Sequence, residues 1–146
     1  MTQPHRIVNG VSVPMSDAEA AEWLAGQSAG PPAPTPLMIA SERDRRLALG
    51  FIYNFGDARG VHRIGTTDED MKGWSDVSTY AGALLDSGDT TTAIAIVTDT
   101  GPCAVTAPEW RAIEIAAAQF RQPIWSKSFA LMATLPGDYA NDDHWT

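Results

Sequence analysis

Polar and apolar residues alternate in short runs near the N-terminus of this chain. Residues 6–14 contain two short β-prone pieces around Asn9-Gly10, a dipeptide that tolerates the positive φ angles of a tight hairpin turn. Ser16 and Glu19 follow with the spacing of a capping box. The pattern predicts a small hairpin and then a helix of about ten residues, whose apolar face holds Ala20, Trp23 and Leu24.

A proline- and glycine-rich stretch separates this N-terminal part from the rest. Four prolines fall within residues 31–36, and they favour an extended polyproline II conformation. We therefore divide the chain into an N-terminal appendage (1–25), a linker (26–36), a main domain (37–137) and an acidic aromatic tail (138–146).

The first half of the main domain shows a helical pattern followed by two short β-prone runs. A helix is expected over residues 37–50, ending at Gly50, and strands over 51–55 and 60–64. Thr67 and the three acidic residues after it are typical of a helix start, because carboxylates are favoured in the first turn. The apolar residues of this helix recur at helical spacing: Met71, Trp74, Ala81, Leu84 and Leu85.

The second half of the main domain begins with an apolar run. Residues 90–97 predict a central, buried strand, with 102–105 as its partner. Thr106 and Glu109 form a second capping box, and Trp110, Ile113, Ala117 and Phe120 recur as the buried stripe of a helix. Pro123 is expected to kink or end this helix. The fold class is α+β, with short antiparallel hairpins packed against three or four amphipathic helices, plus the N-terminal hairpin–helix appendage.

Composition and charge narrow the classes of function. With 44% hydrophobic and 19% charged residues, and no apolar run of about 20 residues, the chain is expected to be soluble. No secretion signal is visible, so synthesis in a cytoplasm is expected. A net charge of −8 opposes binding to nucleic acid or to an anionic membrane. Residues 41–66 hold five arginines and three acids, whereas residues 67–89 hold six acids and one lysine, a polarity that suits intramolecular pairing or a protein partner.

The residues that usually carry chemistry are scattered. The three histidines lie in separate contexts without metal-ligand spacing, and Cys103 stands alone, so we predict no metal and no cofactor. His62 precedes Asp68 and Asp70 closely enough for an acid–base pair, although a structural imidazole–carboxylate hydrogen bond is the preferred interpretation. No catalytic residue is predicted.

The five tryptophans are the remaining unusual feature. Trp74, Trp110 and Trp125 fall on apolar helix faces and predict core positions, whereas Trp23 and Trp145 lie on peripheral segments that cannot easily share that core. Peripheral aromatic residues commonly anchor a partner, and the acids of the tail could pair with arginines of another copy. The candidate partner interface consists of Trp23, Arg43, Arg45, Arg46, Tyr139, Asp142, Asp143 and Trp145.

Several motifs together resemble a known family. They are SERDRR at 41–46, FIYNF at 51–55, GVHRI at 60–64, TDED at 67–70 and TAPEW at 106–110. Over about residues 40–135 the chain resembles a phage domain family found at the ends of tail-fibre and related tail proteins. Its first 25 residues also look like the openings of phage tail-fibre assembly proteins.

The resemblance implies a non-enzymatic structural component of a bacteriophage tail, in the tail fibre or baseplate region, made in the host cytoplasm and located in the virion tail. Its partners would be other tail proteins or further copies of itself, with neither nucleic acid nor membrane. Two alternatives stay open. One is a tail-fibre assembly chaperone that is absent from the finished virion. The other is a small hydrolase or ligand-binding protein that uses His62 and the nearby acids.

Overall fold

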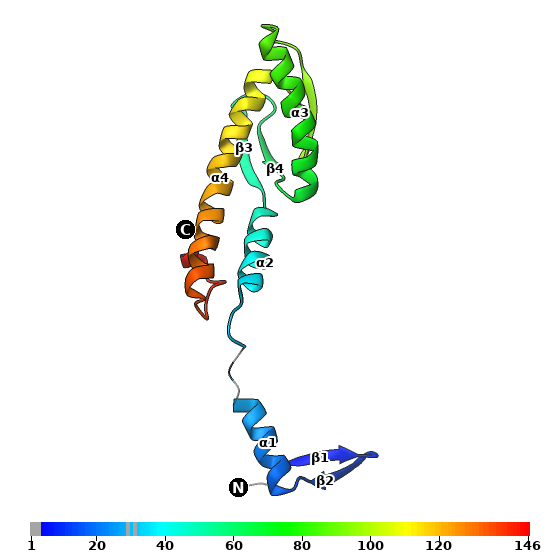
Figure 1. The fold of residues 1–146 in the computed structure, drawn as a ribbon. Helices are drawn as coiled ribbons and strands as arrows, with labels where there is room; N and C mark the ends of the chain where they lie inside the picture. The colour runs from blue at the N-terminus through cyan, green and yellow to red at the C-terminus, as the bar shows by residue number, and fades with distance from the viewer. Residues whose placement is uncertain (1–3, 29, 31) are drawn as a thin grey trace. The chain divides into compact units, whose positions relative to one another are not determined.

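The computed structural model describes residues 4–28, 30 and 32–146 (Figure 1). The chain divides into two compact units, Met1–Ala33 and Pro34–Thr146, and each is taken by itself below. The described residues form four α-helices and three antiparallel two-stranded sheets. About 52% of the described residues are helical and 19% are in strands, and the fold is α+β.

The first unit is a hairpin followed by a helix. Strands β1 (His5–Val8) and β2 (Val11–Pro14) pair antiparallel around Asn9-Gly10, both of which have positive φ angles, 50° and 79°. The helix α1 (Asp17–Ser28) begins where the Ser16 hydroxyl accepts the backbone N–H of Glu19 and the Glu19 carboxylate accepts the backbone N–H of Ser16. The predicted hairpin, capping box and helix are confirmed.

The second unit contains two hairpins and three helices. The helix α2 (Pro36–Leu47) precedes the hairpin of β3 (Phe51–Asn54) and β4 (Val61–Ile64). The helix α3 (Asp68–Asp86) leads to the hairpin of β5 (Ile94–Thr98) and β6 (Gly101–Val105), and α4 (Ala107–Thr134) follows. Gly50, with φ 63°, joins α2 to β3, and a β-carbon there would collide with the carbonyl oxygen of Ile64.

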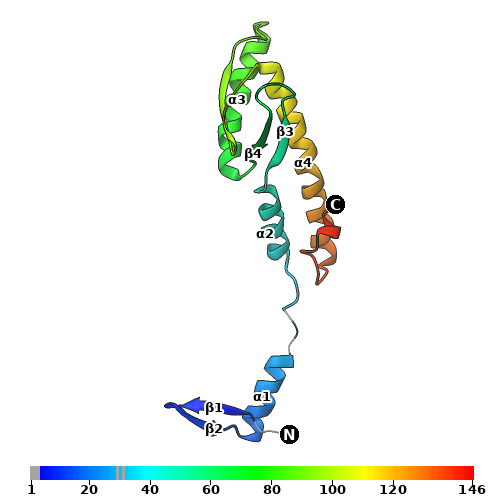
Figure 2. The ribbon, with the colours of Figure 1, turned by 180° about the vertical axis from the view of Figure 1, so that it is seen from behind.

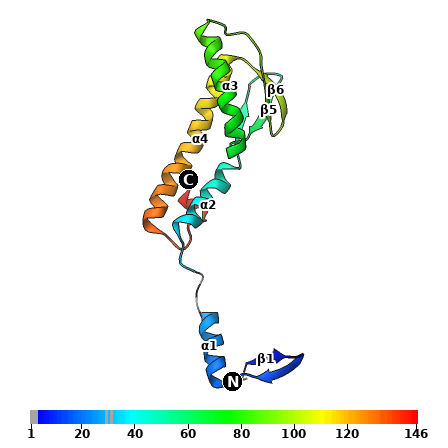
Figure 3. The same ribbon diagram turned by 45° about the vertical axis from the view of Figure 1, so that its right-hand side comes forward.

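The long helix α4, seen from behind in Figure 2, contributes to two apolar clusters. The first cluster lies where the N-terminal half of α4 packs against α3 and both hairpins, and the second lies where its C-terminal half packs against α2 (Figures 1 and 3). The first contains Phe51, Ile64, Ile94, Ile96, Val105, Trp110 and Ile113 among others. The second contains Ile39, Leu47, Ile124, Leu131 and Trp145.

The structure contradicts one expectation about these elements and part of another. The strand β5 is not central, because it pairs only with β6 in a two-stranded sheet of the described residues, and Val97 is 86% exposed. Its isoleucines alternate toward the core, which explains the apolar run without burying both faces. Of the two outcomes expected at Pro123, an end of the helix is wrong, because α4 continues to Thr134; a kink at this position stays a prediction. A proline removes one backbone donor, and buried Ile124 and Leu131 hold the following turns against α2.

Candidate functional site

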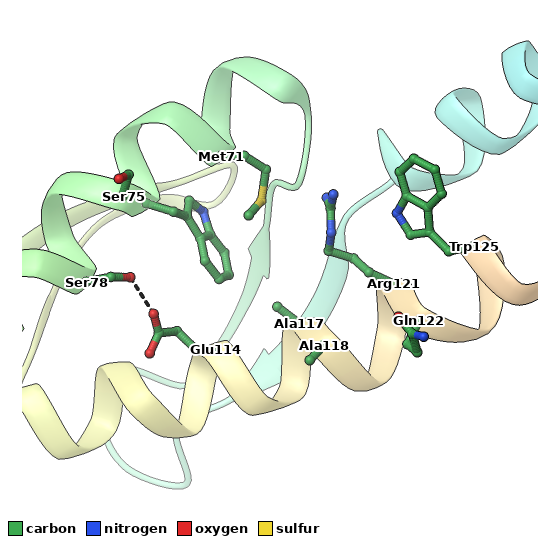
Figure 4. A pocket seen from close by; sticks show the side chains of 10 residues that line it. Met71, Ser75, Ser78, Glu114, Ala117, Ala118, Arg121, Gln122 and Trp125 are labelled. Atoms are coloured by element: carbon green, nitrogen blue, oxygen red, sulfur yellow. Dashed lines mark hydrogen bonds between the residues drawn. The ribbon is translucent and has the colours of Figure 1, made fainter.

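A groove of about 520 Å³ runs between α3 and α4 (Figure 4). Its wall on α3 is formed by Met71, Trp74, Ser75 and Ser78, and its floor on α4 by Glu114, Ala117, Ala118, Arg121, Gln122 and Trp125. We call this set of residues the groove. Its shape follows from side-chain size, because two alanines stand on α4 where larger side chains would fill the space between the helices.

Polar contacts join the helices at both ends of the groove. At one end the Ser78 hydroxyl donates to the Glu114 carboxylate (Figure 4). The same hydroxyl accepts the indole N–H of Trp110 at 3.0 Å. At the other end Arg121 Nη1 donates to the carbonyl oxygen of Thr66 at 2.9 Å, just before the N-terminus of α3. The groove is therefore a preformed feature of the folded domain.

Arg121 is the group of the groove with spare binding capacity. Of its guanidinium, Nη1 alone has a hydrogen-bond partner among the described residues, and no carboxylate of that part of the chain pairs with it. An arginine presents five N–H donors in a fixed planar fork. The groove thus offers apolar walls together with a cation that can receive an anionic group of a ligand or partner.

The first unit presents a second candidate surface, which we call the arm: residues 4–28, comprising β1, β2 and α1. No side chain is buried across residues 4–27. On α1, Trp23 is 44% exposed and Leu24 is 53% exposed, and the hairpin exposes Ile7 and Val11 as well. A lone two-stranded hairpin and a 12-residue helix are each only marginally stable in water. The arm lacks the buried core that normally stabilises such elements.

The structure corrects the prediction that Trp145 stands apart from the core. Its side chain is 5% exposed, its indole N–H donates to the carbonyl oxygen of Tyr139 at 2.7 Å, and the Arg46 guanidinium lies 4.9 Å from the ring centroid. Arg46 also pairs with Asp142 of the same chain at 2.7 Å. The segment after α4 folds back onto α2 and α4. There the second cluster supplies the apolar contacts that this segment cannot make by itself.

The other predicted interface residues of the second unit make contacts within the same chain. Arg43 lies over the Trp125 ring, 4.0 Å from its centroid, and pairs with Asp44. Arg45 pairs with Glu42 at 2.7 Å and thereby lowers the pKa of that carboxyl. Tyr139 packs partly against the second cluster, and the exposed Asp143 lies in the short 3₁₀ turn Asp142–His144. A partner role for these residues stays a prediction.

His62 has different partners from those expected. It is 8% exposed, its Nδ1 lies 2.8 Å from the Thr98 hydroxyl, and its Nε2 lies 3.2 Å from the carbonyl oxygen of Arg59. Within the described chain no carboxylate hydrogen-bonds to this imidazole, so the predicted pairing with Asp68 or Asp70 is wrong. The acids of that segment serve the helix start instead, where Asp70 accepts the backbone N–H of Thr67 at 2.9 Å. His62 connects the two hairpins of the first cluster.

A strong ion pair lies nearby, at the start of α4. Arg59 Nη1 donates to Glu109 Oε2 at 3.1 Å and to the carbonyl oxygen of Ala104 at 2.8 Å. The hydrogen bonds from Arg59 lower the pKa of Glu109 to about 2. Arg59 thus connects the loop after β3 to both β6 and α4, and we assign this ion pair a structural role.

Metal binding and membrane insertion find no support in the part of the chain that the structure describes. Across residues 4–28, 30 and 32–146, no three His, Cys, Asp or Glu side chains are grouped to hold a metal ion. In the same ranges no helix has the combined length and hydrophobicity to cross a bilayer.

Sequence reasoning missed the groove, because it depends on which helices pack together. The signal that was present is local: Ala116, Ala117 and Ala118 in a row, with Glu114 and Arg121 two turns apart on the same side of α4. Comparison of the chain with protein-family models, with curated proteins and with solved structures found no match.

Proposed function

We propose that this protein is a non-enzymatic structural component of a bacteriophage tail that acts through protein–protein contacts. The observation that carries the proposal is the arm. Its hairpin and helix expose Ile7, Val11, Trp23 and Leu24 and bury no side chain across residues 4–27. Several large apolar side chains exposed on a unit with no core of its own are typical of a surface that is covered by a partner.

The spacer after the arm supports the same function. Proline-rich linkers hold connected parts at a distance as semi-rigid spacers. A folded domain that carries an exposed apolar module on such a spacer is suited to attach to a neighbouring subunit. The resemblance of residues 40–135 to domains at the ends of tail-fibre proteins is the reason for proposing a tail fibre or baseplate as the setting. The competing function in that setting is an assembly chaperone that leaves before the virion is complete.

The test is quantitative mass spectrometry of virions from cells infected with the phage that encodes the chain. We expect a fixed copy number per particle that survives density-gradient purification. A Trp23→Ala/Leu24→Ala double variant should be lost from particles, whereas Glu22→Ala, on the opposite side of α1, should be retained. A chain that is abundant in infected cells but absent from purified particles would refute the structural function and identify the chaperone.

A further inference from the structure

We propose that the groove of one copy of this chain receives helix α1 from the arm of a second copy, so that copies join head to tail. The inference rests on the proposed function, because it names the partner of the arm as another copy of the same chain. It connects two apolar surfaces of the described residues: the groove of one molecule and the arm of another.

The dimensions of the two surfaces agree. The floor of the groove follows α4 from Glu114 to Trp125, about 17 Å at the helical rise of about 1.5 Å per residue. By the same rise, the 12 residues of α1 extend over about 18 Å. One helix of this length therefore occupies the groove from end to end.

The anchors of α1 have the spacing that binding of a helix in a groove requires. Such helices bind through apolar side chains at positions i, i+3 and i+4, which Ala20, Trp23 and Leu24 provide. The side chains they would meet are Trp74 and Met71 of the α3 wall, above the two alanines of the floor. A tryptophan inserted beside another indole is the kind of anchor that dominates binding energy at interfaces.

The charges of the two surfaces also agree. The helix α1 carries three acids, Asp17, Glu19 and Glu22, and no basic residue. Asp17 precedes Leu24 by seven positions and so lies at the edge of the same apolar face. The groove supplies Arg121, which no carboxylate of the described chain neutralises. A carboxylate at the edge of α1 can pair with it, which fixes the direction of the helix in the groove.

The spacer favours a second copy over the same chain. A proline-rich segment resists the reversal that would return an arm to the groove of its own molecule. A contact between two different surfaces is heterologous, and repetition of such a contact builds rings or filaments. Assemblies of both kinds are suited to a tail structure made of many subunits.

The experiment measures the association of full-length chains by sedimentation velocity over a range of concentrations. The wild type should self-associate with increasing concentration. Trp23→Ala removes the anchor of the arm, and Ala118→Phe fills the groove with a larger side chain on an exposed position. Each variant alone should stay monomeric. Mixed together they should form a one-to-one complex and nothing larger, because one chain keeps an intact arm and the other keeps an intact groove.

Matched variants control for indirect effects. Glu22→Ala lies on the opposite side of α1, and Ala112→Phe places the same side chain on an exposed position of α4 outside the groove. Both should associate like the wild type, and all variants should keep the wild-type far-ultraviolet circular dichroism. Arg121→Glu should weaken association at least tenfold and remove its sensitivity to salt.

A wild type that is monomeric at every concentration, or a mixture that forms no heterodimer, overturns the inference. Its failure is distinguishable from failure of the proposed function. If the Trp23→Ala/Leu24→Ala variant is lost from virions while the wild-type chain is monomeric in solution, the arm binds a different tail protein. If copies associate through arm and groove while virions lack the chain, the structural function is wrong and the contact between copies stands.

Discussion

Replacing Trp145 by alanine should destabilise the second unit, although the residue is the penultimate one of the chain. The indole is 5% exposed and packs in the second cluster with Ile39, Leu47 and Ile124. Truncating a buried tryptophan to alanine costs about 3–5 kcal/mol of unfolding free energy. The segment after α4 is peripheral and can shift to reduce the cavity that is left, so we expect the lower part of this range, about 3 kcal/mol.

Part of this loss of unfolding free energy comes from polar contacts, and a second variant separates it from the apolar part. The hydrogen bond from the indole N–H to the carbonyl oxygen of Tyr139 contributes about 1 kcal/mol, and the contact with the Arg46 guanidinium contributes about 0.5–1 kcal/mol. Trp145→Phe keeps an aromatic ring but loses the N–H, so it should cost about 1–2 kcal/mol. Asp143→Ala, at an exposed position of the same segment, should stay within about 0.5 kcal/mol of the wild type.

The assay is urea unfolding followed by far-ultraviolet circular dichroism, which does not depend on the tryptophan that is removed. The midpoint of the transition should move to a lower urea concentration. The slope of the unfolding free energy against urea concentration should stay the same, because the rest of the folded core is intact. If Trp145→Ala unfolds within about 0.5 kcal/mol of the wild type, the C-terminal segment does not pack on α2 and α4, and the reasoning from its burial is wrong.

Three further predictions address the first cluster and its connections. Trp110→Ala should lower the free energy of urea unfolding by about 3–5 kcal/mol, because the ring is buried and its indole N–H donates to Ser78. Arg111→Ala, at an exposed position, should lower it by less than about 1 kcal/mol. Equal effects would contradict the assigned buried face of α4. Gly50→Ala should lower the thermal midpoint more than Gly56→Ala does. Both glycines have positive φ, but only at Gly50 would an added β-carbon collide with the backbone, at Ile64. Equal decreases in the midpoint would contradict this close approach. Because Arg59 lowers the pKa of Glu109 from 4.5 to about 2 in the folded chain, this carboxylate contributes stability above about pH 4.5 that is lost as the pH falls toward 2. Glu109→Gln should therefore lose less stability than the wild type between pH 5 and about pH 2.5, and parallel acid unfolding curves would refute the coupling.

Local signals predicted most of the elements. Thr67 with Asp70 and Thr106 with Glu109 form capping boxes at the starts of α3 and α4, as expected from their spacing. Asn9-Gly10 forms the turn of the first hairpin, as predicted. The turn needs positive φ angles at two positions, and this dipeptide tolerates them without help from other residues. Signals of this kind act within a few residues and need no knowledge of the rest of the chain.

The features that could not be predicted depend on contacts between distant segments. The burial of Trp145 requires α2 and α4 to be packed first, and the hydrogen bond between His62 and Thr98 requires the two hairpins to meet. The groove exists because Met71 and Trp74 of α3 lie opposite the alanines of α4. No periodicity in a single segment contains that information, since it arises from the pairing of two helices whose groove residues are 36 or more positions apart in the chain.

The way the second cluster closes the domain also determines how the second unit responds to tension. The second unit begins at Pro34 and its first helix, α2, at Pro36; three residues into this helix, Ile39 packs in the same cluster as Trp145. A pull between the spacer and the C-terminus is therefore transmitted directly across the cluster formed by α2, the end of α4 and Trp145. The hairpins and α3 lie outside this path, so the first cluster carries little force until Trp145 is released.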